Sequence, residues 1–426
     1  MFDILLPINS TEFPASVFKI DNGLTLIHQE ISTTPVVVAD VWVRAGATLE
    51  PESWYGMAHF LEHMIFKGTK RIKAGVFDQT IENRGGVSNA ATSYDYAHYS
   101  LTTASTYVEE ILPLMGELLI NAAIPEEEFN SERNVVLEEI RQAADNPDWI
   151  GFQALYKSVY QQHPYGRSVL GSEQNIVKHE VQQMRCFHRA HYQPQNMTVA
   201  IAGGINESKA LELVNRTFDK FAPPPRDYPS TKTVTKPKIA GVYRQEIQLP
   251  NLEQARLLMA WVAPGVEKLR VGYALDLLSA ILAGGRTSRL VCDLREKQQL
   301  VNGIYSSFSL QKQSSLFTIN AWLELDELER VEELIKLHLQ DLITRGVTEQ
   351  ELTKAKRLLC NDYAFSTETP NQLAGLYGYY NTIASAELSV TYPQQIQSFD
   401  VKELQKIASK YLSPENYAVT VIKPFC

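Results

Sequence analysis

The chain has 426 residues, of which 44% are hydrophobic and 21% are charged, and its formal net charge is −9 at pH 7. This length is too great for one ordinary core and suits two domains of about 200 residues in a globular protein. The negative charge argues against nucleic-acid binding, and no apolar run approaches the length that spans a bilayer.

The first predicted elements are strands followed by a helix. Residues 18–43 are typical of a strand meander, with a turn signal at Asn22-Gly23 and a β-branched run at 36–43. A helix is expected over residues 57–67, because no proline or glycine interrupts its apolar pattern. This helix contains His59-Phe60-Leu61-Glu62-His63.

This motif has the spacing of half a zinc site. His59 and His63 are four residues apart, so their imidazoles share one helix face. A single histidine on an apolar helix is more often a hydrogen-bonded core residue, but two stacked imidazoles are hard to satisfy without a metal. Glu62 lies at the edge of the same face and could reach a zinc-activated water. A third ligand is still required.

The elements after the motif alternate between helix and strand patterns. They are a helix at 76–83, paired strands over 87–102 and a helix at 105–122. The next helix begins after Pro125 and runs to about Ala144. On it, Glu132 and Glu139 are seven residues apart and share a face. Because an acidic helix face usually points to water, the pattern alone assigns them no function.

The remaining elements of the first half are helices at 149–160 and 181–191, a strand at 197–202 and a helix ending near Phe221. Residues 221–241, rich in proline, serine, threonine and lysine, form the best linker in the chain. We therefore expect a zinc-bearing domain at 1–225, a linker at 226–240 and a homologous domain without a metal site at 241–426.

The second half repeats the order of the first. Its elements are a strand at 255–262, a helix at 271–282, a helix to about Gln299 and strands to Leu325. Residues 347–352 mirror 124–129, a register that places Ala355 opposite Glu132 and Asp362 opposite Glu139. The sequence therefore predicts two copies of one α+β unit, with the chemistry in the first copy only.

The motif, residues 85–92 and residues 132–140 resemble the pitrilysin/insulinase zinc metallopeptidases, also called inverzincins. Residues 192–197 and 294–297 add weaker support, and the resemblance covers essentially the whole chain. The nearest branch resembles the bacterial relatives of the mitochondrial processing peptidase β-subunit. The resemblance implies an α+β fold of two homologous domains, each a largely antiparallel sheet covered by helices, which together form one half of a clam-shell.

The resemblance also implies the metal ligands. The family takes its third zinc ligand from a glutamate roughly seventy-five residues after the second histidine. Glu139 lies 76 residues after His63 and fits this position better than Glu138, which points about 100° away on the same helix. We therefore expect His59, His63 and Glu139 to bind Zn²⁺, and Glu132 to be the carboxylate that orients the site.

The implied activity is that of a zinc-dependent endopeptidase for short or unfolded peptides. Glu62 is expected to take the proton of a zinc-activated water and pass it to the leaving amine. Relatives bind the substrate as an added strand at a sheet edge, which matches residues 87–92. Asn89 and Ala90 are then expected to offer backbone groups, and Phe60 to border the residue before the scissile bond.

The second half departs from the family pattern. Many relatives carry an Arg and a Tyr seven residues apart that hold the substrate backbone. Arg295 is present here, but the tyrosine position is Asn302. Tyr305 follows three residues later, on the opposite side of a strand, and replaces the tyrosine only if the strand bulges. The resemblance thus implies a heterodimer whose partner supplies the Arg/Tyr clamp, with a homodimer left open.

Two alternatives belong to other function classes, namely a non-catalytic core or assembly subunit and a peptide-binding module of the same fold. The chain keeps all five residues of the implied zinc site, which favours an enzyme. Its four cysteines form no C-x-x-C pair, and its first residues lack the pattern of a secretory signal. We therefore expect a cytoplasmic protein that uses no membrane.

Overall fold

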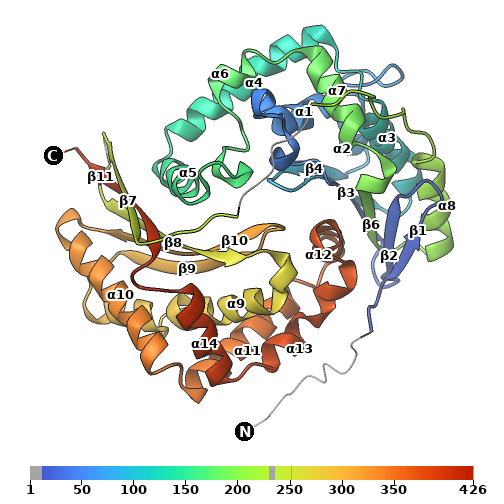
Figure 1. The fold of residues 1–426 in the computed structure, drawn as a ribbon. Coiled ribbons are helices and arrows are strands. Elements are labelled where there is room, and N and C mark those ends of the chain that lie inside the picture. The colour runs from blue at the N-terminus through green and yellow to red at the C-terminus, as the bar shows by residue number, and fades with distance from the viewer. Residues whose placement is uncertain (1–11, 230–235, 251, 426) are drawn as a thin grey trace.

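Two β-sheets covered by helices make up the computed structural model, which describes residues 12–229, 236–250 and 252–425 (Figure 1). The first sheet contains β1 (Ser16–Lys19), β2 (Thr25–Glu30), β3 (Val36–Val43), β4 (Val87–Thr92), β5 (Ala97–Ala104) and β6 (Met197–Gly203). The second contains β7 (Val242–Leu249), β8 (Ala255–Pro264), β9 (Gly303–Ser309), β10 (Ser314–Leu323) and β11 (Tyr417–Pro424).

The two sheets share one topology. The strand order is β1-β2-β6-β3-β5-β4 in the first sheet and β7-β11-β8-β10-β9 in the second. Within each sheet one pair of neighbours is parallel, β2 with β6 and β7 with β11, and the other described pairs are antiparallel. Apart from β1, the strands correspond one to one in order and direction. The predicted α+β fold of two homologous domains is therefore confirmed.

Helices fill the layers outside and between the sheets. The first half contributes α1 (Met57–Ile65), α2 (Val76–Asn83), α3 (Val108–Asn121), α4 (Glu126–Ala144), α5 (Pro147–Tyr160), α6 (Glu173–Ile176), α7 (Val181–His191) and α8 (Glu207–Thr217). The second contributes α9 (Leu269–Ala283), a π-helical segment (Val291–Lys297), α10 (Leu328–Thr344), α11 (Glu349–Phe365), α12 (Pro370–Ile383), α13 (Tyr392–Gln397) and α14 (Val401–Tyr411). The predicted helices at 76–83 and 181–191 have the expected bounds.

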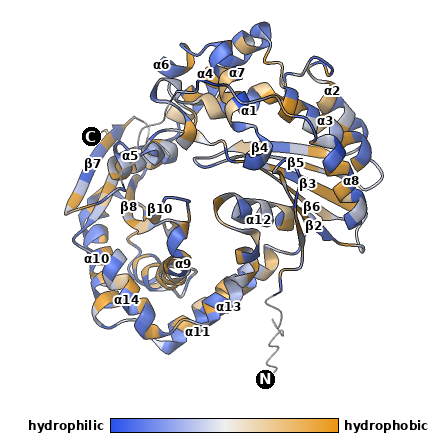
Figure 2. Ribbon diagram, turned by 45° about the vertical axis from the view of Figure 1, so that its right-hand side comes forward, coloured by the Kyte–Doolittle hydropathy of each residue, from blue (hydrophilic) through white to orange (hydrophobic). Residues whose placement is uncertain are grey.

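The first sheet is covered on both faces. Alternate side chains of β3, among them Val37, Ala39 and Val41, pack with α1, α3 and α8 in the main core, whereas Val38 packs with α12 on the other face. Strands β3 and β6 are accordingly buried along nearly their whole length, and Figure 2 shows them largely hydrophobic. Within the described residues, no helix is both long enough and apolar enough to cross a bilayer.

One helix from each half of the chain packs on the sheet of the other half. Helix α5 packs on β8 and β11, where Leu155 and Tyr156 join a core with Leu258 and Ile422. Helix α12 packs on β3 and β6 of the first sheet, although its red colour in Figure 1 marks it as part of the second half. The sequence pattern did not predict this exchange. The domain boundaries stay a prediction, and residues 230–235 of the expected linker lie outside the described residues.

The turn between β4 and β5 is hydrogen-bonded to the second half. Asp95 Oδ2 in this turn accepts hydrogen bonds from the Tyr165 hydroxyl at 2.6 Å and from the Lys312 backbone N–H at 3.2 Å. The Tyr165 oxygen also accepts from the Gln313 N–H at 3.1 Å. Lys312 and Gln313 lie between β9 and β10, so these bonds hold the edge hairpin of the first sheet against that of the second.

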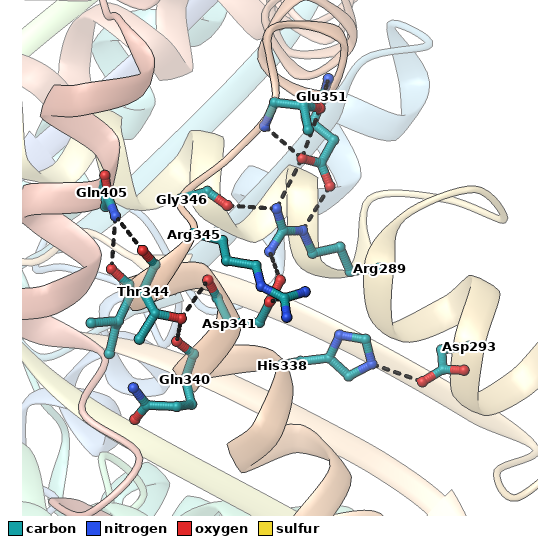
Figure 3. Close-up of polar contacts among 12 residues, drawn as sticks. Arg289, Asp293, His338, Gln340, Asp341, Thr344, Arg345, Gly346, Glu351 and Gln405 are labelled. Carbon is teal, nitrogen blue, oxygen red and sulfur yellow. Dashed lines mark hydrogen bonds and ion pairs between the residues drawn. The ribbon is translucent and has the colours of Figure 1, made fainter.

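A largely buried arginine fixes the start of α11 through the polar contacts drawn in Figure 3. Arg289 donates to the two carboxylate oxygens of Glu351 at 2.6 and 2.9 Å and to the carbonyl of Gly346 at 2.8 Å. Burial by itself raises the pKa of Glu351, but Arg289 and the backbone N–H of Thr348 lower it to about 2. The ionised carboxylate therefore caps α11 at Thr348.

The packing of α12 on the first sheet predicts opposite effects at two glycines of one helix. A Cβ at Gly378 would overlap Cδ1 and Nε1 of Trp42, whose ring stacks on His98. We expect G378A to lower the free energy of unfolding by about 1–3 kcal/mol. At Gly375 the nearest atom is Asp40 Oδ2 at 3.9 Å. The control G375A should be neutral or up to about 1 kcal/mol more stable in urea denaturation. Equal midpoints for the two variants would contradict this packing.

Candidate active site

Helix α1 begins where the chain turns through a left-handed residue. Gly56 precedes the helix with a φ of 88°, a conformation that favours glycine. The buried carboxylate of Glu50 accepts hydrogen bonds from the N–H groups of Gly56 at 3.1 Å and Ala58 at 2.8 Å, and burial raises its pKa to about 7. These bonds satisfy the first N–H groups of the helix and fix the direction in which His59 and His63 project.

Helix α4 is held against α1 by a pair of aromatic rings. Phe60 stacks on Phe129 with ring centroids 4.6 Å apart, and this contact brings Glu132 and Glu139 beside the histidines. Phe60 is 0% exposed. The expected contact between Phe60 and substrate stays a prediction, and in this structure the ring is not exposed to a ligand. The side chain fills the core between the two helices instead of lining the site.

Three side chains converge at the junction of α1 and α4. Nε2 of His59 and Nε2 of His63 each lie 3.4 Å from Oε2 of Glu139, and one ligand atom of each residue lies within 4.8 Å of the others. Hydrogen bonds from His59 and then His63 lower the pKa of Glu139, so its carboxylate is ionised as metal binding requires. Glu138 points away and pairs with Arg141 at 3.5 Å.

The spacing of these atoms suits a zinc ion. Zinc bonds of about 2.0–2.2 Å in tetrahedral geometry put neighbouring ligand atoms about 3.3–3.6 Å apart, which the two 3.4 Å distances match. Two imidazoles and one carboxylate are also a ligand set that zinc accepts, with a fourth position left open. Among the described residues, His59, His63 and Glu139 form the single group of three or more such side chains that could hold a metal.

A carboxylate and a lysine orient one of the two histidines. Oε1 of Glu132 lies 2.9 Å from Nδ1 of His63, and Oε2 of Glu132 pairs with Nζ of Lys67 at 2.6 Å. Burial by itself raises the pKa of Glu132, but Lys67 and then His63 outweigh it and lower the pKa. This places Glu132 where an orienting carboxylate was expected. By contrast, Nδ1 of His59 is buried without a hydrogen-bond partner in the described part of the chain.

Sequence analysis missed Lys67, although its spacing contained a signal. Lys67 follows His63 by four residues, which places it near the same face just beyond the end of α1. A cation at that position has the glutamates of α4 as its nearest charge partners. The family motif includes only the metal ligands and the general base, so a comparison with the motif does not identify Lys67.

Glu62 is held from the neighbouring strand. The hydroxyl of Thr92, the last residue of β4, donates to Oε2 of Glu62 at 2.5 Å. Oε1 of Glu62 has no hydrogen-bond partner within the described residues, so one oxygen of the carboxylate is fixed and the other is free, and the side chain lines a pocket together with His63. Sequence spacing could not have identified Thr92, because the contact joins two elements whose relative position depends on the folded sheet.

Strand β4 forms the free edge of the first sheet beside this site. It pairs with β5 and with no other described strand. Asn89 and Ala90 lie here as expected, and the Ala90 N–H donates to Oδ1 of Asn89 at 3.0 Å. A pocket of about 330 Å³ is lined by this strand together with Glu62 and His63 of α1, the two residues Phe66 and Lys67 after α1, Asp78 of α2 and Glu132 of α4. A second pocket of about 520 Å³ is lined by residues of α4 only, among them Glu139.

Among the described residues, no contact joins the residues of the expected clamp to the expected zinc ligands. Arg295, in the π-helical segment, pairs with its neighbour Glu296 at 2.9 and 2.7 Å. Asn302 is exposed just before β9, and the ring of Tyr305 within β9 packs at a tilt against Trp322, with centroids 5.1 Å apart.

The second half has no copy of the metal site in its described residues. Helix α9, which by chain order and topology corresponds to α1, contains no histidine. On α11, the positions that mirror Glu132 and Glu139 are Ala355, which is buried, and Asp362, which is exposed. The duplicated fold therefore carries the converging histidines and glutamate once.

Comparisons with known proteins agree with this division. A model of the insulinase family, peptidase family M16, matches residues 25–173, and a model of the peptidase M16 inactive domain matches residues 179–359. The first match contains both histidines and Glu139, and the second contains Arg295 and Asn302.

Relatives with full-length similarity are named as zinc proteases or processing peptidases. The zinc protease PqqE of Helicobacter pylori is 29% identical over 410 residues, which cover 95% of this chain and 91% of that protein. The probable mitochondrial-processing peptidase subunit beta of Arabidopsis thaliana is 26% identical over 424 residues, covering 96% and 78%.

A solved structure confirms the similarity of the fold. The crystal structure of a protease from Helicobacter pylori superposes with a TM-score of 0.88 at 27% identity and covers 96% of this chain and 99% of that one. The two family models, the full-length relatives and this structure agree over both halves. The chain belongs to the insulinase family of zinc proteases, peptidase family M16.

Proposed function

We propose that this chain is a zinc metalloendopeptidase that hydrolyses short or unfolded peptides. The observation that carries the proposal is the convergence of His59, His63 and Glu139, in which Nε2 of each histidine lies 3.4 Å from Oε2 of Glu139. The names of the relatives as zinc proteases support the same activity. The site residues and the metal stay predictions that the experiments below test.

Each side chain of this site has its own function in the proposed hydrolysis of a peptide bond. A bound zinc supplies Lewis-acid activation of a water molecule and of the scissile carbonyl. Glu62 takes the proton of the attacking water on Oε1 and gives it to the leaving amine, while Thr92 holds Oε2 and limits rotation of the carboxylate. Glu132 keeps the His63 ring in one orientation, and Lys67 keeps Glu132 ionised and in place.

The free edge of β4 receives the substrate in this proposal. An extended peptide adds a strand there, using the backbone groups of Asn89 and Ala90. The Ala90 N–H is now bonded to the side chain of Asn89, so the incoming carbonyl displaces that amide. The pocket of about 330 Å³, which Glu62 and His63 help to line, holds a neighbouring side chain of the peptide.

We further propose that the active form is a heterodimer whose partner supplies an Arg/Tyr clamp. Asn302 stands at the tyrosine position, Arg295 is engaged by Glu296, and Tyr305 is engaged by Trp322. One relative is itself named as a subunit. A homodimer, in which Tyr305 takes over the clamp, is the competing arrangement.

One observation favours a non-catalytic alternative. The model that matches residues 179–359 is that of an inactive domain, and a chain of this fold could act as an assembly subunit or capture peptides without cleaving them. Zinc content together with Glu62-dependent cleavage separates these functions from an enzyme. The cytoplasmic location is a separate prediction, with which the free thiols of Cys186, Cys292 and Cys360 agree.

The general base is tested by E62Q. This change keeps the shape of the side chain but removes its proton acceptor, so we expect kcat to fall by about 10²–10⁴-fold with zinc content unchanged. Cleavage of a quenched fluorescent peptide and metal analysis measure the two quantities. The matched control is E138Q, because Glu138 is exposed one residue from Glu139 and should leave both quantities unchanged. Cleavage by E62Q at the wild-type rate would contradict the assignment of Glu62 as the general base.

The orienting carboxylate is tested by E132Q. Loss of the charged acceptor for His63 should weaken zinc binding by about 10–100-fold, as for other carboxylates that orient metal-bound histidines. Competition with a fluorescent zinc chelator measures this without reference to activity. E138Q again serves as the control on the same helix and should bind zinc like the wild type. Equal zinc affinity in all three proteins would show that Glu132 does not support the site.

The heterodimer is tested on the purified single chain. Alone it should cleave peptides slowly, because no residue completes the clamp beside Arg295. N302Y restores the seven-residue spacing, and N302Y chains that pair with each other should gain about tenfold in kcat/KM through better positioning. Full activity of the wild-type chain alone would contradict the heterodimer. A loss of that activity in Y305F would then assign the clamp to Tyr305.

A further inference from the structure

A groove with no part in the proposed chemistry runs along the helix layer outside the first sheet. It lies between α3, α7, the end of α8 and the loop after α1, and its volume is about 1100 Å³. Apolar side chains supply part of its lining, namely Ile72, Pro113, Leu114 and Ile120. The pockets beside the zinc ligands are smaller, at about 330 and 520 Å³.

The charged side chains of this groove are mostly positive. The cations are Lys70, Arg71, Arg185, Arg189, Arg216 and Lys220, and the acids are Glu117 and Asp219. Six positive against two negative charges leave an excess of four in a chain whose net charge is −9. A concentration of one sign against the charge of the whole molecule focuses the local potential and attracts the opposite charge.

Several of these cations are available to an external anion. Lys70, Arg189 and Arg216 are exposed and form no ion pair within the described residues. Arg71 lies 3.7 Å from Glu117 and is 82% exposed, which makes that pair weak in water.

One arginine of the groove has a different function. Arg185 donates to the carbonyls of Ala123 at 3.2 Å and Ile124 at 2.9 Å and so fixes α7 against the start of α4. The remaining cations therefore stand on a rigid frame, with the apolar lining between them.

We propose that this groove docks an acidic segment of a partner polypeptide, in which Asp or Glu residues alternate with apolar ones. The carboxylates meet the cations of the rim, and the apolar side chains cover the lining between α3 and α7. A concave site with recessed apolar groups does not lie flat on a lipid surface. Its lining also lacks the aromatic platforms on which nucleic-acid bases stack. A polypeptide therefore fits better than either.

The test uses a fluorescein-labelled peptide of alternating glutamate and leucine, with glutamine in place of glutamate as the comparison peptide. Fluorescence anisotropy should show that the acidic peptide binds the whole chain and that added salt weakens the complex. The variant K70E/R189E/R216E should bind at least about tenfold more weakly, because three attractive charges become repulsive. These side chains are exposed and unpaired within the described residues, so the fold should be unchanged by circular dichroism.

The matched control is R357E/K402E/K406E, which makes the same change in net charge on exposed cations of the second half. It should bind the acidic peptide like the wild type. Three results would overturn the proposal: no binding of the acidic peptide, equal losses in the two triple variants, or equal binding of the glutamine peptide. Tighter groove-dependent binding of phosphatidylserine vesicles or single-stranded DNA would overturn the assignment of a polypeptide partner. Zinc content and peptidase activity are not readouts of this test.

Discussion

The contact between α1 and α4 is the interaction on which the candidate site depends. The two histidines come from one helix and the carboxylate from another, 76 residues away, so no local structure can assemble them. Phe60 stacked on Phe129 supplies the packing that holds the helices together, and Glu50 fixes where α1 starts. Because these supports are buried, they fix the positions of α1 and α4 and so bring the two histidine Nε2 atoms to 3.4 Å from Oε2 of Glu139.

The two halves of the duplicated fold are packed against each other near the candidate site. The exchanged helices α5 and α12 place a helix of each half against the sheet of the other, and Asp95 with Tyr165 joins the turn after β4 to the turn after β9. The proposed substrate edge, β4, is therefore held in part by the second half, whose described residues form no metal-binding group of their own. This arrangement gives the second copy a structural function that does not depend on a metal site.

The two surfaces of the first domain suit different partners. The inner edge combines a free strand with ionised carboxylates and histidines, which favours an extended peptide backbone. The outer groove combines unpaired cations with an apolar lining, which favours acidic and apolar side chains. Different elements build the two, β4 with α1 and α4 in one case and α3 with α7 and α8 in the other.

Local sequence patterns were sufficient for much of the fold and for the zinc motif. The helical periodicity of 76–83 and 181–191, the alternation along β4 and β5, and the i, i+4 histidines are all short-range properties that a chain encodes within a few residues. Only the tertiary structure decided that Phe60 faces the core, that Thr92 holds Glu62, that Lys67 holds Glu132, and that α5 and α12 change sides. Each of these depends on which faces of distant elements meet, and periodicity identifies a face without identifying its partner.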